Sequence, residues 1–182
     1  ISTISEPARA ATMLAIETAR AAGRLVSFDP NLRLNLWPSA DAARAGILRL
    51  WPLAHIIKAG DEELHFLTGE ADYHKAAERL WHPELKILLV THGREGSTYI
   101  TPTFSGSVPG FPVPSVDTTG AGDGFMAAAL KGLLERADAY ADPSAMAEIC
   151  RFANAVGAIT TLERGGIPAL PTVEAVETFL RG

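Results

Sequence analysis

Short strand-like runs alternate with longer helical stretches along this chain, and that alternation leaves few architectures open. The clearest strand is the apolar run 87–91, and the stretches 8–22 and 40–50 have helical composition. Such alternation favours an α/β fold with a doubly wound, mainly parallel sheet and helices on both faces. Ligands of such sheets bind at the carboxyl ends of the strands. We further expect a short buried strand at 25–29, a strand at 54–58, antiparallel strands at 97–100 and 106–111, and helices at 61–67, 74–81, 122–135, 145–162 and 173–180.

Composition excludes several classes of protein. The 182 residues suffice for one domain with a substantial core. The net charge of -5, without a basic cluster, argues against a nucleic-acid partner, and the apolar runs are too short to span a bilayer. Cys150 is the single cysteine, so an internal disulfide is excluded and a reducing cytoplasmic location is expected. Its apolar surroundings predict that Cys150 lies in the core.

A turn of small residues precedes the helical run at 122–135. Gly120, Ala121 and Gly122 leave the backbone bare, and Asp123 follows at once. A glycine turn that opens a helix directs unpaired N–H groups and the positive end of the helix dipole at an anion, and phosphate is a common one. A carboxylate beside that anion is a candidate general base. Because Asp at a helix start is also a common cap, the short pattern alone leaves both interpretations open.

The longer string V-D-T-T-G-A-G-D-G-F at 116–125 resembles, without gaps, the second signature of the ribokinase-like (PfkB) carbohydrate kinase family. The resemblance implies that Asp123 is the catalytic base, which takes the proton from the sugar hydroxyl. It also implies that the amides of Gly120, Ala121 and Gly122 form the anion hole. The chain contains neither the P-loop pattern nor the protein-kinase motifs, so those two kinase classes are excluded.

The string D-P-N-L-R-L-N-L-W at 29–37 directly follows an expected strand. Taken alone, it is a proline turn with a surface arginine. It is also similar to a segment of fructokinases and of 2-keto-3-deoxygluconate kinases. That similarity implies that Asn31 and Arg33 face the nucleotide phosphates or the substrate, with Arg33 neutralising charge on the transferred group through its fork of donors.

Acidic residues at 61–63 can be explained as an ordinary helix start, because they complement the helix dipole. The family resemblance assigns Glu63 to the Glu of an N-x-x-E motif, in which Gly60 replaces the Asn. It implies that Glu63 associates with magnesium through water, and magnesium does prefer oxygen ligands and retains several waters.

Two further segments are candidates for contact with the nucleotide. The string T-H-G-R-E-G at 91–96 could be a simple hairpin entry, but it resembles the family's T-x-G-x-x-G loop. Thr91, Gly93 and Gly96 are then expected to bind phosphate or ribose. Asn154 interrupts an apolar helical stretch, and a buried Asn needs hydrogen-bond partners. The resemblance places Asn154 against the adenine.

The string R-G-G-I-P-A-L-P at 164–171 must form a loop and is similar to the corresponding ending of fructokinases. Many relatives bind a monovalent cation, usually potassium, between this loop and the Asp-Thr pair before the anion hole. By analogy, the side chain of Asp117 and the backbone of Thr119 are expected to contribute to such a site.

The combined expectation is an ATP- and magnesium-dependent kinase that phosphorylates a primary sugar hydroxyl, with fructose favoured and 2-keto-3-deoxygluconate the alternative. The chain begins at Ile1 and resembles only the C-terminal part of the family, so the sugar-binding segment and the lid are expected to be missing. A homodimer is expected at full length. A non-catalytic nucleotide-binding fragment stays open. A dinucleotide oxidoreductase is a disfavoured alternative, because no G-x-G-x-x-G follows the first strand.

Overall fold

Five strands form the framework of the computed structural model, which describes residues 3–182. They are arranged in the sheet in the order β1-β2-β3-β4-β5. Strand β1 pairs in parallel with β2, with helix α2 between them in the chain, and β4 pairs antiparallel with β5. The expected α/β class is therefore confirmed. The strands are β1 (Ser27–Phe28), β2 (Ile56–Gly60), β3 (Ile87–Thr91), β4 (Gly96–Ile100) and β5 (Ser105–Pro109).

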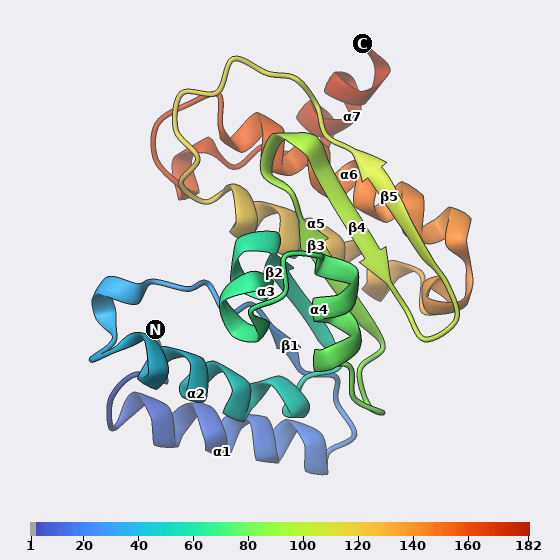
Figure 1. Cartoon of the computed structure of the whole chain (residues 1–182). Helices are drawn as coiled ribbons and strands as arrows, with labels where there is room; N and C mark the ends of the chain where they lie inside the picture. The colour runs from blue at the N-terminus through green and yellow to red at the C-terminus, as the bar shows by residue number, and fades with distance from the viewer. Residues whose placement is uncertain (1–2) are drawn as a thin grey trace. The chain divides into compact units, whose positions relative to one another are not determined.

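The α-helices of residues 3–182 begin and end within two residues of their predicted bounds (Figure 1). None of them is both long enough and apolar enough to cross a membrane. The chain divides into two compact units, Ile1–Leu89 and Val90–Gly182. The helices are α1 (Ala8–Ala21), α2 (Ala40–Leu50), α3 (Asp61–Thr68), α4 (Tyr73–Leu80), α5 (Ala121–Glu135), α6 (Pro143–Thr160) and α7 (Val173–Arg181).

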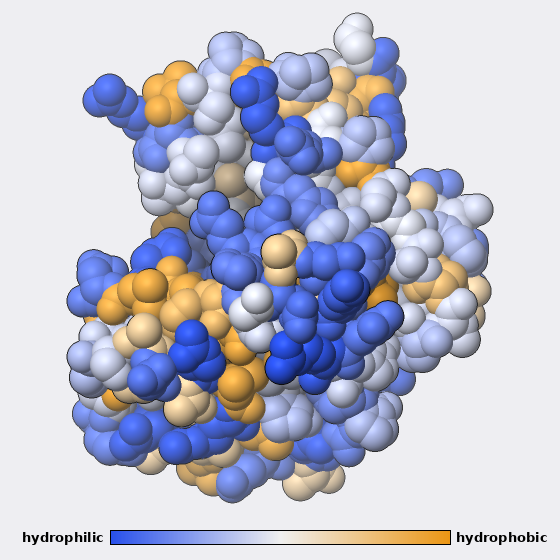
Figure 2. Space-filling view, in the orientation of Figure 1, coloured by the Kyte–Doolittle hydropathy of each residue, from blue (hydrophilic) through white to orange (hydrophobic). Residues whose placement is uncertain are grey.

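The first unit packs its helices around β2, which is buried over almost its whole length. Helix α2 begins where Ser39 accepts the N–H of Ala42 at 3.1 Å, as expected of a serine N-cap. Figure 2 shows hydrophobic residues gathered over α2 and the neighbouring turn η1 (Leu34–Leu36). Leu34 and Leu36 of that turn are 47% and 46% exposed. The first unit therefore combines a buried strand with a partly apolar surface.

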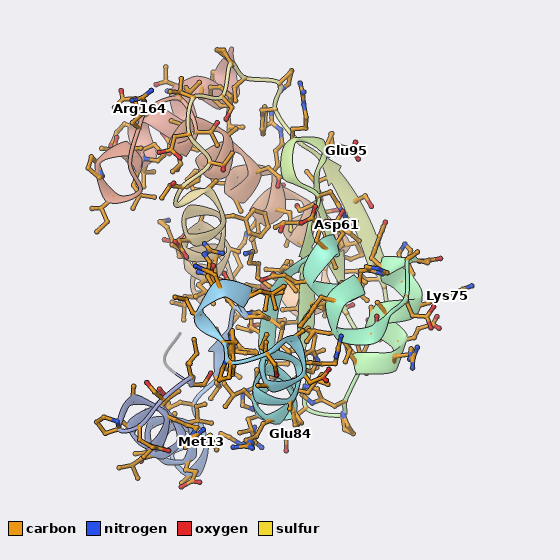
Figure 3. All side chains as sticks on the ribbon, turned by 60° about the vertical axis from the view of Figure 1, so that its left-hand side comes forward. Met13, Asp61, Lys75, Glu84, Glu95 and Arg164 are labelled. Atoms are coloured by element: carbon orange, nitrogen blue, oxygen red, sulfur yellow. The ribbon has the colours of Figure 1, made fainter. Side chains whose placement is uncertain are left out.

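Helix α1 is held to the first unit by polar contacts at its C-terminal end. Arg20 pairs with Glu84, which is labelled in Figure 3 and lies in the loop between α4 and β3. Another nitrogen of Arg20 donates to the carbonyl of Leu53 at 2.9 Å. No residue of α1 is buried. The attachment of this helix therefore depends on half-exposed contacts.

The second unit is organised by the packing of α5 against α6. A Cβ added at Gly132 of α5 would lie 2.8 Å from the side chain of Ile149 of α6, so the two helices approach closely there. Cys150 of α6 is fully buried, which confirms its predicted place in the core. Burial raises the pKa of the Cys150 thiol to about 12.

The strand predicted at 25–29 is wrong in length and in burial. Only Ser27 and Phe28 form β1, with Ser27 exposed and Phe28 half-buried, and Leu25 before them is 47% exposed. The physical reason is the place of β1 at the end of the sheet order, where a strand has one neighbour and its side chains are covered less. The apolar composition of the run does not reveal that position.

Candidate functional site

The start of α5 in the second unit has the features of an anion site. Gly120 precedes the helix with φ of +82°, in the left-handed region that glycine adopts without strain. The N–H of Ala121 donates to the Thr118 carbonyl at 3.2 Å, whereas those of Gly122 and Asp123 have no partner within the helix by their position. Within residues 3–182, no side chain caps this helix. Two N–H groups and the dipole are therefore available to a negative ligand.

Asp123 occupies the first turn of α5 and is exposed. Its carboxylate lies on the turn that carries the candidate anion-binding amides, and the next residues of the helix, Gly124 and Phe125, are buried. Packing of these neighbours fixes the backbone that carries Asp123. The carboxylate therefore lies at the surface of a well-packed helix start and is accessible to solvent.

Asp117 connects two loops beside this helix start. Its Oδ1 accepts the N–H and the hydroxyl of Thr119 at 2.9 and 2.7 Å, and its Oδ2 accepts the N–H of Gly165 at 3.0 Å. These hydrogen bonds, with that from Gly165 first, lower the pKa of Asp117 to about 2. Gly120 also lies so close to Gly166 that an added Cβ would be 2.8 Å from the Gly166 Cα. The 165–166 loop is thus fastened against the anion-binding turn.

A cavity of about 550 Å³ in the second unit brings together six of the predicted site residues. Its volume is in the range of small-molecule sites. Polar groups and bare backbone from the turn after β3 and from α5 meet the apolar ring of Phe111 there. The predicted residues on its wall are Thr91, Gly93, Gly96, Ala121, Gly122 and Asn154, and the wall also includes Arg94, Phe111, Ser115, Thr118, Phe125 and Thr161.

Asn154 lines this cavity but its amide nitrogen is already engaged. The Nδ2 donates to the carbonyls of Val108 and Pro109 at 3.1 and 3.2 Å. Asn154 is 8% exposed, so these bonds satisfy the donors of a nearly buried amide. The bonds fasten α6 to the end of β5 and fix the cavity wall at this point.

The first unit contains a second cluster of polar side chains, built around Asp29. Its Oδ2 accepts from the ammonium of Lys58 at 3.0 Å, and its Oδ1 accepts the N–H of Asn31 at 3.0 Å. The pKa of Asp29 is raised, with burial as the largest cause; the Lys58 ammonium acts in the opposite direction, and the negative charge of Glu63 adds to the rise. The cluster is therefore a desolvated ion pair beneath the loop that follows β1.

Asn31, Arg33 and Glu63 lie in or against that loop in the first unit. Asn31 has φ of +44°, a left-handed conformation that Asn tolerates better than most residues. Arg33 is exposed, and one of its nitrogens donates to the Leu32 carbonyl at 3.1 Å. Glu63 accepts the N–H groups of Leu32 and Gly60. The three predicted residues are thus connected through one short stretch of backbone.

Comparison with known proteins identifies the family. The sequence profile described as "pfkB family carbohydrate kinase" matches residues 1–173. The chain belongs to the pfkB family of carbohydrate kinases. Fructokinase-2 of Solanum habrochaites is 51% identical over 183 residues, which cover 100% of this chain and 56% of that protein. The chain therefore spans little more than half the length of this curated relative.

Solved structures of pfkB-type kinases match the fold closely. The fructokinase of Vibrio cholerae O395, crystallised in its fructose-, ADP- and calcium-bound form, has a TM-score of 0.91 at 33% identity over 98% of this chain and 58% of that chain. The fructokinase of Xylella fastidiosa with bound ATP has a TM-score of 0.90 at 31% identity over 99% of this chain and 59% of that chain. The resemblance to the ribokinase-like family is confirmed.

Sequence reasoning missed two residues of this pfkB chain. One lies in the polar cluster around Asp29, and the other lies on the wall of the cavity. Lys58 pairs with Asp29, and its signal in the sequence is a lone cation within an otherwise apolar strand. Phe111 supplies an aromatic wall of the cavity, but nothing in its local pattern distinguishes it from an ordinary core residue. Its role depends on packing between segments far apart in the chain.

Proposed function

We propose that this chain is the nucleotide-binding and catalytic portion of an ATP-dependent fructokinase. The observation that carries the proposal is the uncapped glycine start of α5, with a carboxylate in its first turn and a 550 Å³ cavity against it. Phosphoryl transfer needs positioning and charge stabilisation more than covalent help from the protein. The site offers both in a member of a carbohydrate kinase family.

In the proposed reaction, the Asp123 carboxylate accepts the proton of a primary sugar hydroxyl. The oxygen then bonds to the γ-phosphorus of ATP, the bond from that phosphorus to the bridging oxygen breaks, and ADP leaves. The family resemblance assigns stabilisation of the charge on the transferred group to the amides at Gly120, Ala121 and Gly122. The Ala121 N–H donates to the Thr118 carbonyl in this structure, so it would have to exchange that bond for one to the phosphoryl group. Arg33 contributes further neutralisation through its guanidinium.

The cavity of the second unit is the proposed nucleotide site. Thr91, Gly93 and Gly96 would contact phosphate or ribose, and Asn154 would border the base. The support is their common wall, which combines bare backbone with the aromatic residues Phe111 and Phe125 and so suits a ligand with both phosphates and a flat base. Asn31 is the proposed nucleotide contact of the first unit.

Magnesium is expected to accompany ATP and to shield its phosphate charge. Each oxygen of Glu63 accepts one backbone N–H and keeps a further acceptor site, which suits the expected contact with a water molecule held by magnesium. Residues 3–182 contain no group of three or more His, Cys, Asp or Glu side chains that could hold a metal. At the proposed potassium site, Asp117 supplies an ionised carboxylate and Thr119 its backbone carbonyl. That cation stays a prediction.

Fructose is the proposed sugar because curated relatives that are about 50% identical over the aligned residues are fructokinases. The Asp29–Trp37 string also resembles a segment of 2-keto-3-deoxygluconate kinases, so that sugar is the alternative substrate. A further alternative is nucleotide binding without turnover, because the chain spans 56% of the relative's length. We also propose a cytoplasmic location, on the strength of the lone cysteine, and a homodimer at full length, by family resemblance.

The decisive experiment uses a polypeptide of the relatives' full length that contains this chain. ADP release is measured with ATP, magnesium and fructose, 2-keto-3-deoxygluconate or ribose. Asp123→Asn is expected to lower kcat on the accepted sugar by about 10²- to 10⁴-fold, because it removes the general base, with ATP affinity unchanged.

The matched control is Asp138→Asn, which removes the same charge from an exposed position after α5 and should leave kcat unchanged. Turnover on 2-keto-3-deoxygluconate alone would replace fructose by the alternative sugar. ATP binding without turnover on any sugar would favour a binding protein. Failure to bind ATP would overturn the kinase proposal.

A further inference from the structure

The side chain of Glu63 bonds to backbone in two separate segments. Its Oε1 accepts the N–H of Leu32 at 2.7 Å, and its Oε2 accepts the N–H of Gly60 at 2.8 Å. Both are short hydrogen bonds to a carboxylate, which are stronger than bonds between neutral groups. Glu63 therefore connects the loop after β1 to Gly60, the last residue of β2, directly before α3.

The start of α3 makes this arrangement rigid. Gly60 is the N-cap residue and has no side chain with which to cap the helix. The Glu63 bond to its N–H is the half of a capping box that an N3 glutamate can supply. Asp61, labelled in Figure 3, marks the first position of the same helical turn. With Gly60 in place of the family's Asn, the N–H of Gly60 is held by Glu63, and the N–H of Glu62 is held by the Asp61 carboxylate at 2.9 Å.

The loop held by Glu63 carries Arg33. Asp29 anchors the beginning of the loop through Lys58 and through the N–H of Asn31. Glu63 then fixes Leu32, which directly precedes Arg33 and whose carbonyl accepts from the Arg33 guanidinium at 3.1 Å. An exposed arginine has many rotamers, so a fixed backbone on its N-terminal side reduces the entropy lost when it binds an anion.

We propose that Glu63 is a positioning residue, which holds the 29–33 loop so that Arg33 is oriented for the phosphoryl group, and that it does not coordinate magnesium directly. The claim that Glu63 orients Arg33 for the phosphoryl group rests on the proposed kinase function. The claim that Glu63 holds the loop by hydrogen bonds does not, so the two claims can be tested separately.

Amide hydrogen exchange on the 182-residue chain, followed by NMR, tests whether Glu63 holds the 29–33 loop. Glu63→Ala should accelerate exchange at Leu32 and Gly60 by about tenfold or more, because both amides lose an ionised acceptor. Glu63→Gln should release at least one of them, since its amide nitrogen cannot accept. Glu62→Gln, the same charge change at the exposed neighbouring position, should alter neither.

Magnesium chloride should leave the side-chain carboxyl resonance of Glu63 in place in the unsubstituted chain. Unchanged exchange rates at Leu32 and Gly60 in Glu63→Ala would refute the claim that Glu63 holds the 29–33 loop. A magnesium-dependent shift of the Glu63 carboxyl resonance that Glu62 does not share would assign Glu63 to the metal instead.

A double-mutant cycle in the full-length kinase tests the action through Arg33. If Glu63 works by orienting Arg33, Arg33→Gln combined with Glu63→Gln should be as slow as Arg33→Gln alone, within about twofold. The magnesium dependence of kcat should be the same in Glu63→Gln and in the unsubstituted enzyme. A general loss of folding or a metal role would instead multiply the two effects, and that result would overturn the proposal. Absence of turnover on every sugar would refute the kinase function and the claim that Glu63 orients Arg33 for catalysis. The hydrogen-exchange data would still show whether Glu63 holds the 29–33 loop.

Discussion

Asp117 is the residue whose protonation most directly affects the loops at the anion-binding turn. Its pKa in the folded chain is about 2, below the ordinary value of 3.8. The folded state therefore binds the proton less tightly than the unfolded state does. The stabilisation is complete above about pH 4 and is lost as the pH falls through 2. Asp117→Asn should lower the melting temperature at pH 7 and reduce the acid-induced decrease between pH 4 and 2.

Calorimetry over that pH range checks this prediction. Asn has one acceptor oxygen, so the N–H of either Thr119 or Gly165 loses its partner. Asp138→Asn, at an exposed position, serves as the control and should keep the acid-induced decrease of the unsubstituted chain. Identical pH profiles for Asp117→Asn and the unsubstituted chain would show that these hydrogen bonds do not lower the pKa of Asp117.

Family motifs allow single residues to be predicted, but not the bonds between them. Asp117 could be assigned to the string at 116–125, whereas its bond to Gly165 spans 48 residues of sequence. Similarly, Glu63 could be assigned to an N-x-x-E motif, but its bond to Leu32 reaches a loop 31 residues earlier. Such pairs arise from tertiary folding, and one sequence contains no local pattern that specifies them.

At the scale of elements, the start of α5 combines a left-handed glycine with a close approach of two backbones. Gly120→Ala should cost roughly 1 kcal/mol for the left-handed conformation, and further stability for the clash with Gly166. Because the clash displaces the helix start, affinity for a non-hydrolysable ATP analogue should fall by about tenfold or more, as measured by titration calorimetry.

Gly69 offers a matched control at the end of α3. Its φ is +77°, but a Cβ added there would meet nothing within 4 Å. Gly69→Ala should therefore lower the melting temperature by only about 2–4 °C and leave ATP-analogue affinity unchanged. Equal affinity losses in the two variants would mean that conformational strain alone, without the contact to Gly166, explains the effect.

Helix bounds were predictable because the signals that define them are local. Ser39 caps α2, Gly69 ends α3 in a left-handed conformation, and Asp142 caps α6 by accepting the N–H of Ser144. Strand β1 was not predictable to the same degree, since the length and burial of a strand depend on its neighbours in the sheet. Local chemistry specifies helix ends, whereas strand pairing needs the whole chain.

At the scale of the whole molecule, burial is distributed unevenly among helices of similar length. Helix α1 has 14 residues and none of them is buried, with Leu14 64% exposed. Helix α5 has 15 residues, of which six are buried. Intrinsic helix propensity favours α1, because α1 is rich in alanine and lacks glycine, whereas α5 contains Gly122, Gly124 and Gly132. Comparing α1 with α5 therefore separates the contribution of packing to helix stability from that of propensity.

Tertiary packing supplies most of the stability of a helix in a protein, whereas isolated helices of this length are marginal in water. Amides in the centre of α1 should therefore exchange with solvent at least about tenfold faster than those in the centre of α5, through local opening well below the free energy of global unfolding. Hydrogen exchange measured on the 182-residue chain by mass spectrometry or NMR gives both values in one experiment. If α1 were the better protected helix, alanine content rather than buried area would govern local stability here. Equal protection would mean that both helices open only when the whole molecule unfolds, and that the contacts of Arg20 with Glu84 and Leu53 suffice to hold α1 without a buried face.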